Sequence, residues 1–325
     1  MNIAISILSI YFFILLGYMA KRMLKDEMNE RGMILMSIYY LQPILAFWGL
    51  SSKKLDMTLI QVPMWYLLIS LICVLLSSVI AYFFFTDIKE KSIITICVVI
   101  GNTGNLGIPL GIALFGDASI IYTSLINICN VFIVYTLGVF FYSRGNFSIK
   151  ESLLNIVKLP VIWFACLALV FNLLEVHIHP SIFHSLEMGA YCTMVIQLVI
   201  FGMYLSNIQL KAINYKLFAY VSLIKFILTP IIAGGILYQC LSFEPMVATI
   251  IFLELIVPLA VTNVNLSALY DCRPLDVTML VFLTSLVFIP FFIAISNLLH
   301  HFTIVSLPWL KKRTALNIFV HWNAS

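Results

Sequence analysis

The sequence predicts an all-α integral membrane protein of about ten transmembrane helices. Three observations favour this class: 62% of the 325 residues are hydrophobic, only 10% are charged, and apolar runs long enough to span a bilayer recur along the chain. In soluble domains roughly a quarter of all residues are charged, because a folded surface must stay hydrated. A hydrocarbon solvent removes that requirement, so the composition indicates a bilayer.

Ten apolar runs reach or approach the roughly 20 residues that a helix needs to cross the hydrocarbon core. Charged or turn-forming residues separate them, as Lys21-Arg22 does after the first run. The runs cover residues 3–20, 33–50, 60–85, 92–115, 119–142, 153–174, 182–206, 213–241, 245–270 and 275–299. The first run lacks a basic stretch before it and an A-x-A cleavage motif, which favours a membrane span over a cleaved signal peptide.

Lysine and arginine fall unevenly on alternate loops. Twelve lie in one set of loops, and only Lys53 and Lys54 lie in the other. The richer set comprises Lys21, Arg22, Lys25, Arg31, Lys89, Lys91, Arg144, Lys150, Lys158, Lys211, Lys216 and Arg273. Basic loops stay cytoplasmic, so we expect a multi-pass protein of the cell membrane with both termini outside. Three basic tail residues, Lys311 to Arg313, oppose this orientation, but a tail after the last span has less influence than the loops before it.

Two of the runs carry a polar, proline-containing interruption. The fourth holds Gly-Asn-Thr-Gly-Asn-Leu-Gly-Ile-Pro at 101–109, and the ninth holds Val-Pro-Leu-Ala-Val-Thr-Asn-Val-Asn at 257–265. A single interruption would be equally consistent with a mere kink, but here two interruptions occupy the same ordinal place in each half of five runs. An odd number of helices turns the second half upside down, which is a common transporter plan. We therefore expect inverted five-helix repeats at 1–145 and 146–300, followed by a C-terminal tail at 301–325.

Each interruption frees backbone groups, because proline lacks an N–H and clashes with the carbonyl one turn back. The freed groups cannot face lipid and must line protein or a wet cavity. The helical segments that begin at Pro109 and near Thr262 direct positive dipole ends into that cavity, where an anion is favoured. Polar side chains add hydrogen-bonding groups at the same level: Asn102, Thr103, Asn105, Thr262 and Asn263. These features predict a carboxylate-bearing substrate near mid-membrane.

Strings along most of the chain, from about residue 5 to 295, resemble the auxin efflux carrier family, which includes plant auxin exporters and bacterial carriers of small organic acids. They are Leu16-Gly17-Tyr18 before Lys21-Arg22, Tyr-Tyr-Leu-Gln-Pro-Ile-Leu at 39–45, Asn102-Thr103 with Gly107-Ile108-Pro109-Leu110, Lys225-Phe226 with Thr229-Pro230, Pro258 with Ser267-Ala268-Leu269-Tyr270, and Phe282-Leu283-Thr284-Ser285 with Pro290. Each string is short, and their common order and spacing carry the resemblance.

The resemblance implies two inverted five-helix repeats, with a scaffold part and a transport part whose two crossed broken helices hold the substrate. It carries over Asn102, Pro109 and Pro258 directly, and it points to bacterial carriers of malate or malonate. Asn105 stands where many relatives have an aromatic or aliphatic residue, which favours a more polar substrate. The long cytoplasmic loop of the plant exporters is absent, so nothing supports auxin itself as the substrate.

Lys225 and Glu254 lie well inside apolar runs, where charges are functional candidates, whereas Glu187 lies nearer the end of its run and is expected at the membrane interface. Lys225, near mid-depth, could neutralise a substrate carboxylate or pair with an acid on another helix. Glu254, one turn before Pro258, suits a proton-coupling role, and a structural pair with Lys225 is the alternative. Gln42 is a candidate cavity group or a bridge between helices. The predicted substrate-binding set is Asn102, Thr103, Asn105, Gly107, Pro109, Pro258, Thr262, Asn263, Gln42 and Lys225.

Together these features predict a secondary transporter of a small mono- or dicarboxylate, driven by a proton gradient or the membrane potential. A sodium-coupled symporter of similar architecture is the alternative, although sodium sites need clustered carboxylates or many carbonyl oxygens. An intramembrane enzyme would need a nucleophile–base pair or a metal set, and no P-loop, HExxH or nucleophile elbow is present. A sensor would carry a signalling domain. We expect no cofactor, no metal and no nucleic-acid partner, with membrane lipids around a candidate homodimer.

Overall fold

The computed structural model describes residues 3–51, 59–207, 214–240 and 244–306. The chain divides into two compact units, one up to Thr284 and one from Ser285 onward. The second unit contains the later part of the last helix, in which the rings of Phe288 and Phe292 stack. The predicted tail at 301–325 lies largely outside the described residues, and its role stays open.

Helices make up nearly all of the described chain, and no strand occurs in that part of it. They are α1 (Ile3–Leu24), α2 (Glu30–Met36), α3 (Gln42–Ser51), α4 (Gln61–Phe84), α5 (Ile88–Cys97), α6 (Ile108–Phe115), α7 (Ile120–Ile133), α8 (Val139–Arg144), α9 (Ile149–Lys158), α10 (Pro160–Leu173), α11 (Pro180–Ser206), α12 (Tyr215–Leu223), α13 (Thr229–Gly234), α14 (Pro245–Ile256), α15 (Thr262–Leu269) and α16 (Pro274–Ser306). Single π-helical turns join several of them, including Thr103–Gly107 before α6 and Ile224–Leu228 between α12 and α13.

Within the described residues, six helical stretches are long and apolar enough to cross a membrane. They are Glu30–Ser51, Gln61–Phe84, Ile120–Arg144, Pro180–Ser206, Tyr215–Tyr238 and Pro274–Ile295, and α9 with α10, bent by 54°, gives a seventh when counted as one span. The all-α membrane class is therefore confirmed. The count of ten and the inverted repeats stay predictions, partly because the apolar helices at Thr103–Phe115 and Pro245–Ile256 are each too short to cross alone.

Local sequence signals explain where many of these helices begin. Pro160, Pro180 and Pro245 each stand in the first turn of a helix, where the missing N–H has no intrahelical partner to lose. Helix α9 begins with a capping box in which Ser148 and Glu151 bond each other's backbone N–H groups. These three prolines therefore mark helix starts.

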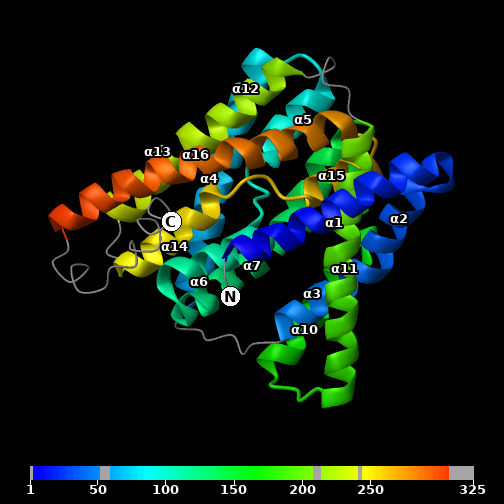
Figure 1. Ribbon diagram of the computed structural model, residues 1–325, viewed down its shortest axis with the longest axis horizontal. Helices are drawn as coiled ribbons and strands as arrows, with labels where there is room; N and C mark the ends of the chain where they lie inside the picture. The colour runs from blue at the N-terminus through cyan, green and yellow to red at the C-terminus, as the bar shows by residue number, and fades with distance from the viewer. Residues whose placement is uncertain (1–2, 52–58, 208–213, 241–243, 307–325) are drawn as a thin grey trace. The chain divides into compact units, whose positions relative to one another are not determined.

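The helices of the first unit pack in two groups. In one, α11 packs against α1, α2 and α3, and α3 also packs against α10 (Figure 1). In the other, α4 packs against α5, α7, α13 and α14, and α5 also packs against α8 and α12. Helix α15 contacts both groups, because it packs against α2 and α11 as well as α8.

Helices α1 and α11 approach most closely at two glycines. A Cβ atom on Gly17 would lie 2.1 Å from the carbonyl oxygen of Val199, and one on Gly202 would lie 2.0 Å from that of Ile14. Small residues let membrane helices pack until their backbones touch, which is a main source of association in lipid. These two positions therefore hold α1 against α11.

We expect Gly202→Ala to destabilise the protein by about 2 kcal/mol, because the new methyl group would overlap a backbone carbonyl that cannot rotate away. Thermal unfolding of the detergent-purified protein measures this loss. Gly49→Ala in α3 is the matched control, since nothing lies within 4 Å of a Cβ atom there. Equal melting temperatures for the two variants would contradict the assigned close contact.

Candidate functional site

Two helices are interrupted where the proline-containing strings predict it. Helix α5 ends at Cys97, and helical structure resumes at Thr103. The predicted start at Pro109 was therefore wrong, because a π-helical turn at Thr103–Gly107 already leads into α6. Helix α14 ends at Ile256, and α15 begins at Thr262. Between these limits the backbone leaves the helical conformation, so its N–H and C=O groups need other partners.

The two interruptions pair with each other. Gly101 and Leu259 form an isolated antiparallel bridge. The N–H of Asn102 donates to the carbonyl of Pro258 at 2.8 Å, and the N–H of Ala260 donates to the carbonyl of Ile100 at 2.9 Å. The broken helices therefore cross at the breaks and satisfy part of each other's exposed backbone, and we call this place the crossing.

Lys225 joins both broken helices at the crossing. Its side chain is fully buried, and Nζ donates to the carbonyls of Val98 and Leu255 at 2.9 Å each. These carbonyls belong to the carboxyl ends of α5 and α14, where the helix dipole leaves partial negative charge. Lys225 forms no ion pair with Glu254, so here it caps two helix ends.

Asn263 also binds the crossing together. Its Nδ2 donates to the carbonyls of Ile100 and Ala260 at 3.0 Å each, and its Oδ1 accepts a hydrogen bond from the Tyr142 hydroxyl at 2.8 Å. The side chain is fully buried. Both of its polar atoms are therefore used in holding the second break against the first.

A second buried network supports the first break. Thr103 Oγ1 donates to Asn127 Oδ1 at 2.8 Å and accepts from Asn130 Nδ2 at 3.1 Å. Asn130 also donates to the carbonyl of Gly101 at 3.0 Å and accepts from the Tyr66 hydroxyl at 3.3 Å. The sequence reasoning missed Asn127, Asn130, Tyr66 and Tyr142. Two asparagines one turn apart in an apolar run, at 127 and 130, were the signal that could have found them.

Glu254 lies against the first broken helix without a polar partner. Its side chain is fully buried, and neither carboxyl oxygen has a hydrogen-bond partner within the described structure. A Cβ atom on Gly107 would lie 2.0 Å from its Oε2, so the carboxyl group occupies the space that this glycine leaves open. Such an arrangement can hold a proton, because the neutral acid is far cheaper to bury than an unpaired carboxylate.

Three of the predicted substrate-binding residues have side chains that are free to bind a ligand at the crossing. Asn102, Asn105 and Thr262 are half-buried, and their side chains make no hydrogen bond among the described residues. Asn102 and Thr262 stand at the amino ends of the helical segments Thr103–Phe115 and α15. Two positive helix ends with unused amide and hydroxyl groups are suited to binding a small anion.

The remaining predicted site residues lie within helices or take part in the backbone bridge. Pro109 lies in the first turn of α6 and is half-buried, and the carbonyl of Pro258 belongs to the bridge. Gln42 is buried at the start of α3, in the helix group of α11, whereas the crossing belongs to the other group. In the described part of the chain no group of three or more His, Cys, Asp or Glu side chains is placed to hold a metal ion.

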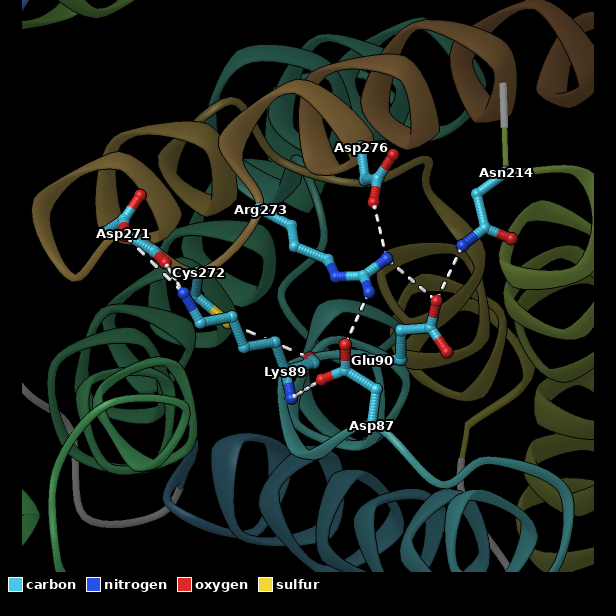
Figure 2. Close-up of polar contacts among 8 residues, drawn as sticks. All are labelled: Asp87, Lys89, Glu90, Asn214, Asp271, Cys272, Arg273 and Asp276. Atoms are coloured by element: carbon cyan, nitrogen blue, oxygen red, sulfur yellow. Dashed lines mark hydrogen bonds and ion pairs between the residues drawn. The ribbon is translucent and has the colours of Figure 1, made fainter. Parts of the chain in front are cut away.

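The far ends of the two broken helices meet in a cluster of charges. Arg273 pairs with Asp87, with Glu90 at 2.8 Å and with Asp276 at 3.2 Å, and its guanidinium lies among the three carboxylates (Figure 2). Asp87 caps the start of α5, and Arg273 follows the end of α15. The cluster therefore ties the outer end of one broken helix to the outer end of the other.

Partial burial acts to raise the pKa of Asp87, but the Lys89 backbone N–H and the Arg273 guanidinium outweigh it and lower that pKa below its ordinary value. The charge of Asp87 therefore stabilises the fold at pH values above about 4, and this contribution is lost as the pH falls through the folded-state pKa.

We expect Arg273→Gln to destabilise the protein by about 1 kcal/mol at neutral pH, since its partners are half-exposed and screened by water. The difference between variant and wild type should shrink below about pH 4, as the pH falls toward the lowered pKa of Asp87 in the folded protein. Thermal unfolding in detergent at several pH values and salt concentrations measures both effects. A pH-independent difference would show that the ion pairs do not carry the stabilisation.

Comparison with known proteins agrees with a membrane transporter. A family model described as membrane transport protein matches residues 2–296. An uncharacterized transporter from Methanocaldococcus jannaschii is 25% identical over 282 residues, which cover 82% of this chain and 88% of that relative. The match includes both interrupted helices, so the crossing lies inside the matched region.

Proposed function

The chain belongs to the membrane transport protein family, as its resemblance to the auxin efflux carriers predicted, and we propose that it is a secondary active transporter of a small organic anion. The substrate class is a mono- or dicarboxylate such as malate or malonate, moved across the cell membrane by alternating access. The observation that carries this proposal is the crossing, where two helix amino ends and three unused polar side chains lie at the breaks.

The character of the crossing favours an anion over a cation. Helix amino ends carry partial positive charge, which stabilises a nearby anion by up to about 2 kcal/mol in a sheltered place. The opposite, negative helix ends are already capped by Lys225. Asn102, Asn105 and Thr262 then supply donors for the carboxylate and acceptors for a substrate hydroxyl.

Transport assays in proteoliposomes test the proposal directly. Purified protein should give saturable flux of labelled malate or malonate, and unlabelled monocarboxylates and dicarboxylates should compete. Asn102→Ala should remove flux while expression and melting temperature stay near wild type, because its side chain makes no hydrogen bond among the described residues. Absence of saturable flux across the carboxylate panel, in either direction, would overturn the proposal.

We propose Glu254 as the residue that couples transport to protons. Glu254→Gln keeps the shape of a protonated carboxyl group but cannot release the proton. Exchange of labelled for unlabelled substrate should continue in this variant, while uphill accumulation driven by an imposed proton gradient is lost. Accumulation equal to wild type would remove Glu254 from the coupling step.

Sodium coupling is the second candidate function. Sodium needs several oxygen ligands at one place, and Glu254 supplies the one buried carboxylate among the described residues of the crossing. Uptake driven by a sodium gradient at equal pH, compared with uptake in potassium alone, separates the two couplings. Dependence on sodium without dependence on the proton gradient would replace the proton proposal.

A further inference from the structure

We infer, on the basis of the proposed transport of organic anions, that a cavity beside α15 is a separate binding site for a small carboxylate, with Arg31 at one wall and Asn265 behind it. The cavity has a volume of about 210 Å³. Its walls include Arg31 and Ile34 of α2, Tyr204 of α11, Ala268 and Leu269 of α15, and the exposed carboxylate of Asp271. This is room for several water molecules or one small organic acid.

The cavity lies between the two helix groups, along a broken helix. Helices α2 and α11 belong to one group, and α15 is the second half of the broken helix whose first residue, Thr262, stands at the crossing. Residues 262, 265 and 268 follow one another at helical spacing of three and therefore lie on one face of α15. That face leads from the crossing to the cavity.

Asn265 is the unused polar group on this face. Its side chain is 1% exposed, and neither Oδ1 nor Nδ2 has a hydrogen-bond partner within the described structure. Asn265 precedes Ala268 by three residues and Leu269 by four, so it lies one turn deeper than the two cavity-lining residues. A buried amide without partners is unfavourable, and a carboxylate entering from the cavity would satisfy its donor.

Arg31 supplies the positive charge of the cavity. It is exposed, and it has no ion-pair partner among the side chains that the structure describes. Glu30, beside Arg31 in the chain, pairs with Lys21 at 2.8 Å. Asp271, which lines the cavity, pairs with Lys89 at 3.5 Å (Figure 2), so its charge is balanced by a lysine other than Arg31. A planar guanidinium left without a partner can bind a carboxylate with two parallel hydrogen bonds.

Thiol labelling of the full-length protein tests this site without relying on transport. Ala268→Cys places a reactive group in the cavity wall. It is combined with replacement by serine of the exposed Cys166 and Cys192, of the half-buried Cys129, and of Cys240, and the same chain without Ala268→Cys gives the background labelling. Anionic and cationic methanethiosulfonate reagents then report the local charge. Arg31→Ala should shift the ratio of the two labelling rates about fivefold toward the cationic reagent, the size expected for one nearby charge.

Malonate is the second probe in this experiment. It should protect the cysteine from labelling in the presence of Arg31, with inorganic phosphate protecting less, and Arg31→Ala or Asn265→Leu should remove the protection. Lys150→Ala is the matched control, because it removes an exposed positive charge from α9, which does not line the cavity.

The outcomes separate this site from the proposed function. Malonate protection without any carboxylate flux would overturn the transport proposal and keep the cavity site. Flux without malonate protection would overturn the cavity site and leave the transport proposal standing. So would labelling rates that are the same with and without Arg31→Ala. Stronger protection by phosphate than by malonate would overturn the carboxylate assignment. Leu269→Cys repeats the experiment from the adjacent wall position if Ala268→Cys fails to give a monodisperse protein.

Discussion

Gly107→Ala is expected to reduce transport by roughly a hundredfold or more, the cost that a displacement of about 1 Å can have at a functional site. A Cβ atom there would lie 2.0 Å from Oε2 of Glu254 and 2.5 Å from its Cδ. Glu254 is fully buried, so its carboxyl group has no solvent-facing place to occupy instead. The side chain must move, and the crossing must move with it. Flux in proteoliposomes and thermal unfolding in detergent measure the two consequences.

A second substitution tests whether the clash is the cause. Glu254→Ala removes the carboxyl group, so the double variant Gly107→Ala/Glu254→Ala should recover most of the stability that Gly107→Ala loses, which is about 2 kcal/mol. Gly235→Ala is the control for a glycine with no neighbour within 4 Å of the added atom. Additive losses in the double variant would show that the two residues act independently.

The two helix breaks could be predicted from the sequence because proline and glycine act locally. Proline and glycine disfavour a regular helix wherever they stand, so the strings at 101–109 and 257–265 mark the region of each interruption without tertiary information. The exact limits differ, since the first break lies at 98–102, before Pro109. The family resemblance, carried by strings along the chain, was confirmed by the family match over residues 2–296. The all-α membrane class followed from the composition together with the recurring apolar runs long enough to span a bilayer.

The sequence does not predict in the same way which polar residues form structural hydrogen bonds and which remain free to bind a ligand. Asn263 and Asn102 are both asparagines at a break, yet the first bonds Tyr142, 121 residues away, and the second has no such bond among the described residues. Which of the two amides forms a structural hydrogen bond depends on long-range packing, and this packing cannot be predicted from the spacing of residues in the sequence. Asn265 was passed over for the same reason, since its unpartnered burial appears only in three dimensions.

Lys225→Met is the second change with a large expected effect, and it separates two roles for a buried lysine. If Lys225 caps helix ends, the variant should lose stability even without substrate. It leaves two buried carbonyls, those of Val98 and Leu255, without their donor. Each such group costs about 1–3 kcal/mol. If Lys225 instead binds substrate, the variant should keep its stability and lose affinity.

We expect the first result, together with loss of flux, because the positions of α5 and α14 at the crossing depend on this one ammonium group. Thermal unfolding in the absence of carboxylate is the deciding measurement, and flux in proteoliposomes follows. Lys216→Met is the matched control, since that lysine lies in the same helical stretch, Tyr215–Tyr238, but donates to the carbonyl of Phe84 at an exposed position. A stable Lys225→Met protein with a raised malonate KM would assign Lys225 to the substrate.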